Sequence, residues 1–181
     1  MRKLAGFIAA HLYPGQDELR QACDRAASLS KADLLTGIVG EFPELQGIMG
    51  GEYALHDGES TAVAQAIREQ YLPKAIEGEL PKTQAGQILS LADRLDSIAA
   101  FFHVGIVPTG SEDPFALRRH ATAIVRIMLE GNFRTDMGPW IEHARALVSD
   151  HGFKGTPDSD KQGRRRIVEF LFERVRHYGR V

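Results

Sequence analysis

The residues whose types and spacing suit metal or acid–base chemistry begin with two carboxylates. Asp93 and Asp96 lie three positions apart in the stretch LADRLDSIAAFFH, so on a helix they share one face. Paired carboxylates can hold a metal ion or act as acid and base. We expect His103, at the apolar end of this stretch, to be buried rather than a ligand. The sequence therefore favours a structural role for both aspartates, in ion pairs or caps.

His56-Asp57 is the only His-Asp dyad in the chain. Imidazole and carboxylate together suit a divalent transition metal that activates water. The dyad stands between Gly50-Gly51 and Gly58, where we expect a loop, and there Asp57 would help to cap the helix that follows. We predict no metal site and no catalytic residue in this chain.

A group of arginines has the chemistry for binding phosphate. Arg118 and Arg119 follow the loop PTGSEDP, and Arg126 lies seven positions after Arg119 on the same predicted helix face. Guanidinium groups contact phosphates bidentately, and loop amides can add to that contact. The alternative is a solvated face that pairs with nearby acidic residues. A second basic run, Arg164–Arg166, is of a kind that is usually solvated.

The elements that must position these residues are helices. Apolar residues recur at intervals of three and four along almost the whole chain. The predicted helices cover 17–39, 59–71, 84–103, 113–130, 137–150 and 161–178, with a short turn at 44–49. No alternating run of β-branched and aromatic residues reaches strand length. We predict an all-α fold.

Composition limits the classes of function. The chain has 181 residues, a formal charge of −2 and 43% hydrophobic residues, which suffices for a domain with a real core. A charge near zero argues against a histone-like polyanion binder. With Cys23 as its single cysteine, the chain can form no internal disulfide and no cysteine-built zinc site, so we expect a cytoplasmic protein. No apolar run approaches membrane length, and no glycine-rich nucleotide loop is present.

Three stretches together resemble a known family. They are Lys31–Ala54 (KADLLTGIVGEFPELQGIMGGEYA), Leu91–Gly105 and Pro108–Arg119 (PTGSEDPFALRR). In this order and spacing they resemble the β subunit of the bacterial heterotetrameric glycyl-tRNA synthetase. The resemblance implies that residues 1–150 form its HD-like helical domain, a helical bundle. It implies that 151–181 form a linker and a helix leading toward a C-terminal anticodon-binding domain beyond this chain.

The resemblance also implies a function. In this family the α subunit carries the site for glycine and ATP with Mg, and the β subunit supplies tRNA recognition. The expected partners are tRNA(Gly), the α subunit and the rest of the β subunit, with no membrane and no cofactor in this chain. We expect contact with acceptor-arm phosphates from Arg118, Arg119 and Arg126, and more weakly from Lys31, Arg94 and Ser111.

Two alternatives stay open. One is an HD-type metal-dependent phosphohydrolase that uses Asp93 with His56-Asp57, although the predicted helix ending near Glu41 lacks the His-Asp pair of such enzymes. The other is a structural spacer, in which EFPELQG and the Pro-Thr-Gly-Ser loop pack against other domains of the subunit. The isolated chain would then contribute no chemistry of its own.

Overall fold

The computed structural model describes residues 1–109, 112–152 and 154–178. Their regular elements are all helical, and the one β-type contact among them is an isolated bridge between Thr109 and Glu112. The elements are α1 (Arg2–Leu12), α2 (Asp17–Leu29), η1 (Ala32–Leu35), α3 (Gly37–Glu41), η2 (Pro43–Leu45), α4 (Ile48–His56), α5 (Thr61–Glu69), α6 (Gln84–His103), α7 (Leu117–Glu130), α8 (Gly138–Asp150) and α9 (Pro157–Tyr178). The predicted all-α class is confirmed, while the likeness to HD domains stays a prediction.

The chain divides into two compact units, Met1–Asp93 and Arg94–Val181, and the boundary lies within α6. Each unit is described by itself below. The segment 151–181 contains α9, and α9 packs against α7 and α8 inside the second unit. None of the helices in the described ranges is long and apolar enough to cross a membrane.

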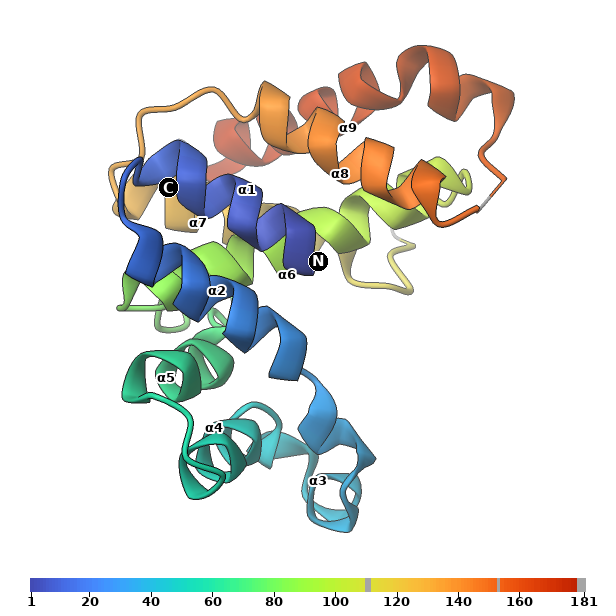
Figure 1. Cartoon of the computed structure of the whole chain (residues 1–181). Helices are drawn as coiled ribbons and strands as arrows, with labels where there is room; N and C mark the ends of the chain where they lie inside the picture. Colours follow the sequence, from blue (N-terminus) through green and yellow to red (C-terminus); the bar gives the residue numbers. More distant parts are fainter. Residues whose placement is uncertain (110–111, 153, 179–181) are drawn as a thin grey trace. The chain divides into compact units, whose positions relative to one another are not determined.

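The first unit is built from helices that pack in the order α1, α2, α5 and α4. α1 lies against α2, α2 against α5, and α5 against α4 (Figure 1). α1 forms and packs because Leu4 and Ile8, one helical turn apart, are fully buried on its inner side. The cap of α5 is Ser60 rather than the expected Asp57, and it accepts a hydrogen bond from the Val63 amide at 3.3 Å.

The predicted helix over 17–39 is wrong in its second half. α2 ends at Leu29, and the chain continues through η1 and α3. The break falls at Lys31, whose φ of 69° places it in the left-handed region. The loop expected around His56-Asp57 is also wrong, because α4 runs to His56 and Asp57 is its C-cap.

The second unit packs α9 against α7 and α8 (Figure 1). Trp140 of α8, Ile124 of α7 and Ile167 of α9 are among its buried side chains. The helix predicted to begin at 113 begins instead at Leu117, because Ala116 has a left-handed φ of 56°. The four residues before α7 therefore form a separate loop, and this loop shapes the start of the helix.

Candidate nucleic-acid interface

The start of α7 is capped by a carboxylate from the loop that precedes it. Asp113 accepts hydrogen bonds from the Leu117 amide at 2.7 Å and from the Arg118 amide at 3.0 Å. The left-handed turn at Ala116 brings the loop back over the helix end. The first amides of a helix ordinarily attract anions, since they lack partners within the helix. Here an internal carboxylate already occupies them.

Because those amides are taken, a phosphate near this end would have to be met by side chains. Arg118 and Arg119 stand in the first turn of α7. Arg118 is half-buried and its Nη1 donates to the Glu112 carbonyl at 3.0 Å, which holds the side chain over the loop. Arg119 is exposed, and among the described residues it has no ion-pair partner. Of the arginines predicted to contact phosphate, Arg119 is thus the exposed one, and Arg118 lies next to it.

Arg126 has a different environment, although it lies on the same helix. It is buried, and its Nε lies 2.8 Å from Oε1 of Glu130. Tyr178 of α9 donates a hydrogen bond to the same oxygen at 2.8 Å. The Arg126 hydrogen bond, together with that of Tyr178, lowers the pKa of Glu130 below its usual value. This network ties α7 to α9, which is a bracing function.

Lys31 is also committed to an ion pair. Its Nζ lies 2.5 Å from Oδ1 of Asp93, whose side chain is almost wholly buried. Asp33, two residues further along, accepts hydrogen bonds from the amides of Gly47 at 2.7 Å and Gly50 at 3.2 Å and so caps α4. The Lys31–Ala54 motif is therefore held together internally and to α6, through Lys31 and Asp33.

Tyr71 lies in the same part of the first unit. Burial raises its pKa to about 12, and the negative charges of Asp33 and Asp93 add to that effect.

The structural role predicted for Asp93 agrees with its ion pair to Lys31. The role of Asp33 was missed because the apolar pattern predicted one continuous helix over 17–39.

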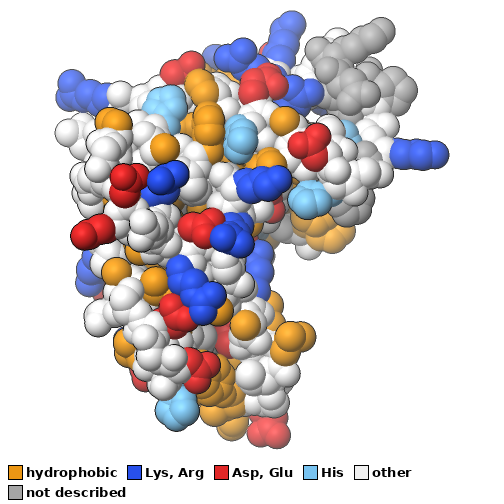
Figure 2. Space-filling model, in the orientation of Figure 1, with side chains coloured by type: hydrophobic (Ala, Val, Ile, Leu, Met, Phe, Trp, Pro, Cys, Tyr) orange, Lys and Arg blue, Asp and Glu red, His pale blue; other side chains and the backbone are white. Residues whose placement is uncertain are grey.

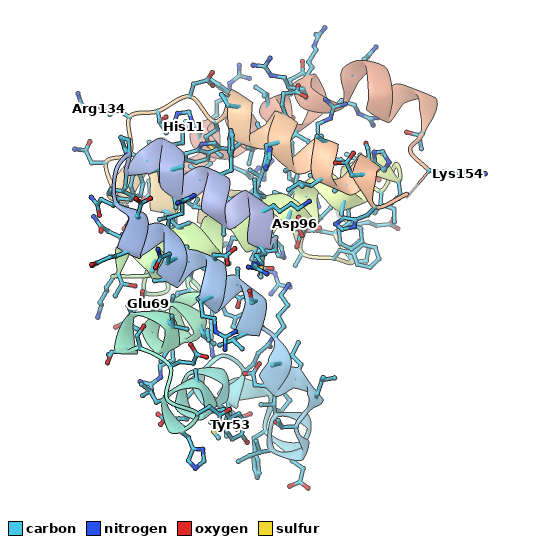
Figure 3. All side chains as sticks on the ribbon, viewed as in Figure 1. His11, Tyr53, Glu69, Asp96, Arg134 and Lys154 are labelled. Carbon is cyan, nitrogen blue, oxygen red and sulfur yellow. The ribbon has the colours of Figure 1, made fainter. Side chains whose placement is uncertain are left out.

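The remaining candidates occupy less accessible positions. Arg94 opens the second unit within α6, with 6% of its surface exposed. Asp96 follows on the same helix, half-buried (Figure 3). Ser111 lies outside the described residues. The structure thus brings Arg118 and Arg119 together at one helix end, places Arg126 about two turns further along α7, and puts Lys31 in the other unit.

Sequence reasoning also missed a buried carboxylate that binds the residue just before α6. Glu69, the last residue of α5, accepts hydrogen bonds from the Thr83 amide at 3.0 Å and the Thr83 hydroxyl at 2.6 Å (Figure 3). The Thr83 hydroxyl in turn accepts from the Gly86 amide at 3.0 Å. Threonine just before a predicted helix was the signal for this cap. No sequence pattern pointed to its distant partner Glu69.

No metal chemistry emerges from these side chains. Within 1–109, 112–152 and 154–178 there is no group of three or more His, Cys, Asp or Glu side chains placed to hold a metal ion. His56 and Asp57 form a contact of 3.2 Å on an exposed surface. The dyad is thus a surface pair at the end of α4.

Charge is mixed over the face that Figure 2 shows, where Lys and Arg side chains alternate with Asp and Glu. This agrees with a formal charge of −2 for the whole chain. A polyanion would therefore be met by a local group of cations rather than by a broad positive field.

Comparisons with known proteins identify relatives along the whole chain. The family model described as glycyl-tRNA synthetase beta subunit matches residues 1–180. The glycine–tRNA ligase beta subunit of Citrifermentans bemidjiense is 49% identical over 148 residues, which are 82% of this chain and 21% of the relative. That of Shouchella clausii is 41% identical over 175 residues, 97% of this chain and 25% of the relative. That of Ectopseudomonas mendocina is 45% identical over 173 residues, 96% of this chain and 24% of the relative. The chain thus spans about a quarter of these relatives.

Proposed function

The chain belongs to the glycyl-tRNA synthetase beta subunit family, and from this we propose that it is a tRNA-contacting part of a glycine–tRNA ligase. Its partners would be tRNA(Gly), the α subunit and the rest of the β subunit. The observation that carries the proposal is the start of α7, where an exposed arginine stands beside a second one and the helix amides are already capped.

In this proposal the chain supplies affinity for tRNA, and glycine activation with ATP and Mg takes place on the α subunit. The contribution is electrostatic, because each guanidinium that neutralises a phosphate releases counterions from the RNA. Arg118 and Arg119 are the main contacts. Arg126 and Arg94 are buried, and the exposed Lys31 is paired with Asp93. Each can contribute only where its present interactions give way to a phosphate.

The test removes both arginines at the start of α7 in the complete ligase, as Arg118→Ala with Arg119→Ala. We expect the KM for tRNA to rise while glycine-dependent ATP–pyrophosphate exchange is unchanged. Two lost phosphate contacts also make binding less sensitive to salt. At about −0.7 to −0.9 per contact, the slope of log K against log salt should decrease in magnitude by about 1.4 to 1.8.

A matched control removes two arginines from other surfaces. Arg20 on α2 and Arg165 on α9 are exposed and form ion pairs along their own helices, with Asp17 and Glu169. Arg20→Ala with Arg165→Ala changes the net charge equally, so a specific site predicts a smaller effect on tRNA. An equal KM and an equal salt slope in the two double variants would refute the proposal.

A second candidate, the structural spacer, is favoured by a surface of the first unit. The large apolar residues exposed between η1 and the end of α4 include Leu35, which is 92% exposed, and Phe42, between α3 and η2. Such a surface is typical of an interface. About three-quarters of each relative lies outside the matched region and could cover it. Leu35→Asp in the complete β subunit should then impair assembly, measured by size-exclusion chromatography, without changing the salt slope for tRNA.

A further inference from the structure

An aromatic pair lies directly before α7. Phe115 stacks on Phe101 of α6, with ring centroids 4.3 Å apart and an angle of 25° between the planes. Phe115 nevertheless remains 44% exposed. A phenylalanine ordinarily gains most from being fully buried. This ring is instead held at the surface, with Phe101 supporting it.

The ring is fixed in place by the loop that carries it. Two residues before it, Asp113 is anchored to the amides of α7, and one residue after it, Ala116 takes the left-handed conformation. Glu112 is bonded through its carbonyl to Arg118. The position of Phe115 is therefore set before any ligand arrives, and a ligand that stacks on it would lose little binding energy to ordering of the loop.

The types of residue that precede and follow Phe115 indicate which kind of ligand could bind there. Val104 and Ile106, at the end of α6 and just beyond it, are partly exposed as well. Arg118 and Arg119 follow Phe115 within four residues along the chain. An exposed aromatic ring followed within four residues by two arginines is the composition of a surface that binds single-stranded nucleic acid, in which the ring stacks a base and the cations meet the backbone. A purely apolar partner would not engage the exposed Arg119.

We propose that Phe115 is a stacking platform for an unpaired RNA base, with Arg119 contacting a phosphate next to that base. The inference rests on the proposed tRNA contact and narrows its ligand to a single-stranded segment adjoining a duplex. Bases inside an A-form helix are covered by their neighbours on both faces, so the ring cannot stack on them. Unstacked bases at an end or in a loop have a free face.

The experiment compares two RNA hairpins that share one stem, of which one is blunt and one ends in a four-nucleotide single-stranded tail. The tail carries 2-aminopurine, whose fluorescence falls when it stacks on an aromatic ring. Binding is measured with the full chain and with Phe115→Leu, which keeps an apolar side chain of similar size but removes the π face. Phe115→Tyr is the matched variant that retains an aromatic ring.

We expect Phe115→Leu to weaken binding of the tailed hairpin by about 5- to 100-fold, the range measured for single base–aromatic stacks. Binding of the blunt hairpin should be unchanged, and 2-aminopurine should be quenched by the original chain and by Phe115→Tyr but not by Phe115→Leu. Unchanged affinity of Phe115→Leu for the tailed hairpin overturns the inference, as does an equal loss for both hairpins.

The test separates this inference from the proposal on which it rests. If Arg118→Ala with Arg119→Ala weakens both hairpins while Phe115→Leu weakens neither, RNA contact stands and the stacking platform is refuted. If neither change affects either hairpin, both are refuted. Equal thermal unfolding midpoints for Phe115→Leu and Phe115→Tyr establish that a loss of binding does not arise from a disturbed loop.

Discussion

Replacement of Asp113 by alanine should destabilise the second unit, because this carboxylate alone caps two amides at the start of α7. It accepts hydrogen bonds at 2.7 and 3.0 Å from Leu117 and Arg118. Loss of a helix cap costs about 1 kcal/mol, and loss of a negative charge at the positive end of the helix dipole adds about 0.3–1 kcal/mol. We therefore expect a decrease of about 1.5–2 kcal/mol in the free energy of unfolding.

The expected change in melting temperature depends on how much of the chain unfolds together. The second unit, from Arg94 to Val181, has the size of a small domain. For a domain of about 90 residues, a loss of 2 kcal/mol lowers Tm by about 10 °C, and for about twice that length the decrease is half as large. Calorimetry of the original chain and of Asp113→Ala distinguishes these cases, since independent units give separate transitions.

Two further variants serve as a stabilising comparison and as a control for the melting temperature. Ala116→Gly should raise Tm, because glycine adopts the left-handed φ of 56° without the strain of a Cβ, for a gain of about 1 kcal/mol. Asp150, exposed at the end of α8, lies at the negative end of its helix, so Asp150→Ala should have little effect. The reasoning is wrong if Asp113→Ala and Asp150→Ala melt at the same temperature.

Two other predictions concern ionisable groups. Cys23 is fully buried, and burial raises its pKa to about 12. At pH 8 the thiol should therefore not react with Ellman's reagent until guanidinium unfolds the chain. Rapid reaction of the folded chain would contradict this. The pKa of Glu130 is lowered by Arg126 and Tyr178, so its contribution is present above the unfolded pKa of about 4.3 and is lost as the pH falls through the lower folded value. Because the Glu130 side chain is itself exposed, Glu130→Gln should lower the free energy of unfolding at pH 7 by less than about 1 kcal/mol, and the difference should narrow in acid. A difference that is constant with pH would refute the assignment.

Helical periodicity was enough to predict the fold class, and the predicted range 84–103 coincides with α6. The two largest errors share a cause. The predicted helices over 17–39 and 113–130 are interrupted or shortened at Lys31 and Ala116, which are both in the left-handed region. Lysine and alanine are good helix formers, so local propensity favours continuation at both positions. Near each turn, a carboxylate forms a helix cap that the helical period does not reveal, Asp33 at α4 and Asp113 at α7.

The family resemblance is confirmed, whereas the environments of individual arginines could not be predicted. Arg118 and Arg126 look alike in the sequence, as cations on one helix. Arg126 is buried because Glu130 and Tyr178 surround it, and Tyr178 is 48 residues from Glu130 along the chain. A contact across that separation leaves no local pattern. Burial of Arg94 likewise follows from packing around α6 rather than from its neighbours in the sequence.

The caps formed by Asp33 and Asp113 limit how either unit could bind the phosphates of RNA. Asp33 occupies amides at the start of α4, and Asp113 occupies those at the start of α7. Helix amides are a common way to bind phosphate, and both of these sites are closed by carboxylates that would also repel it. The motifs that identify the family therefore stabilise helix ends. In the proposed RNA contact, recognition at α7 therefore depends on side chains, with Arg119 providing charge and Phe115 an aromatic face. Loss of the Asp113 cap should consequently weaken RNA binding even though it removes a negative charge, because the positions of both side chains depend on it.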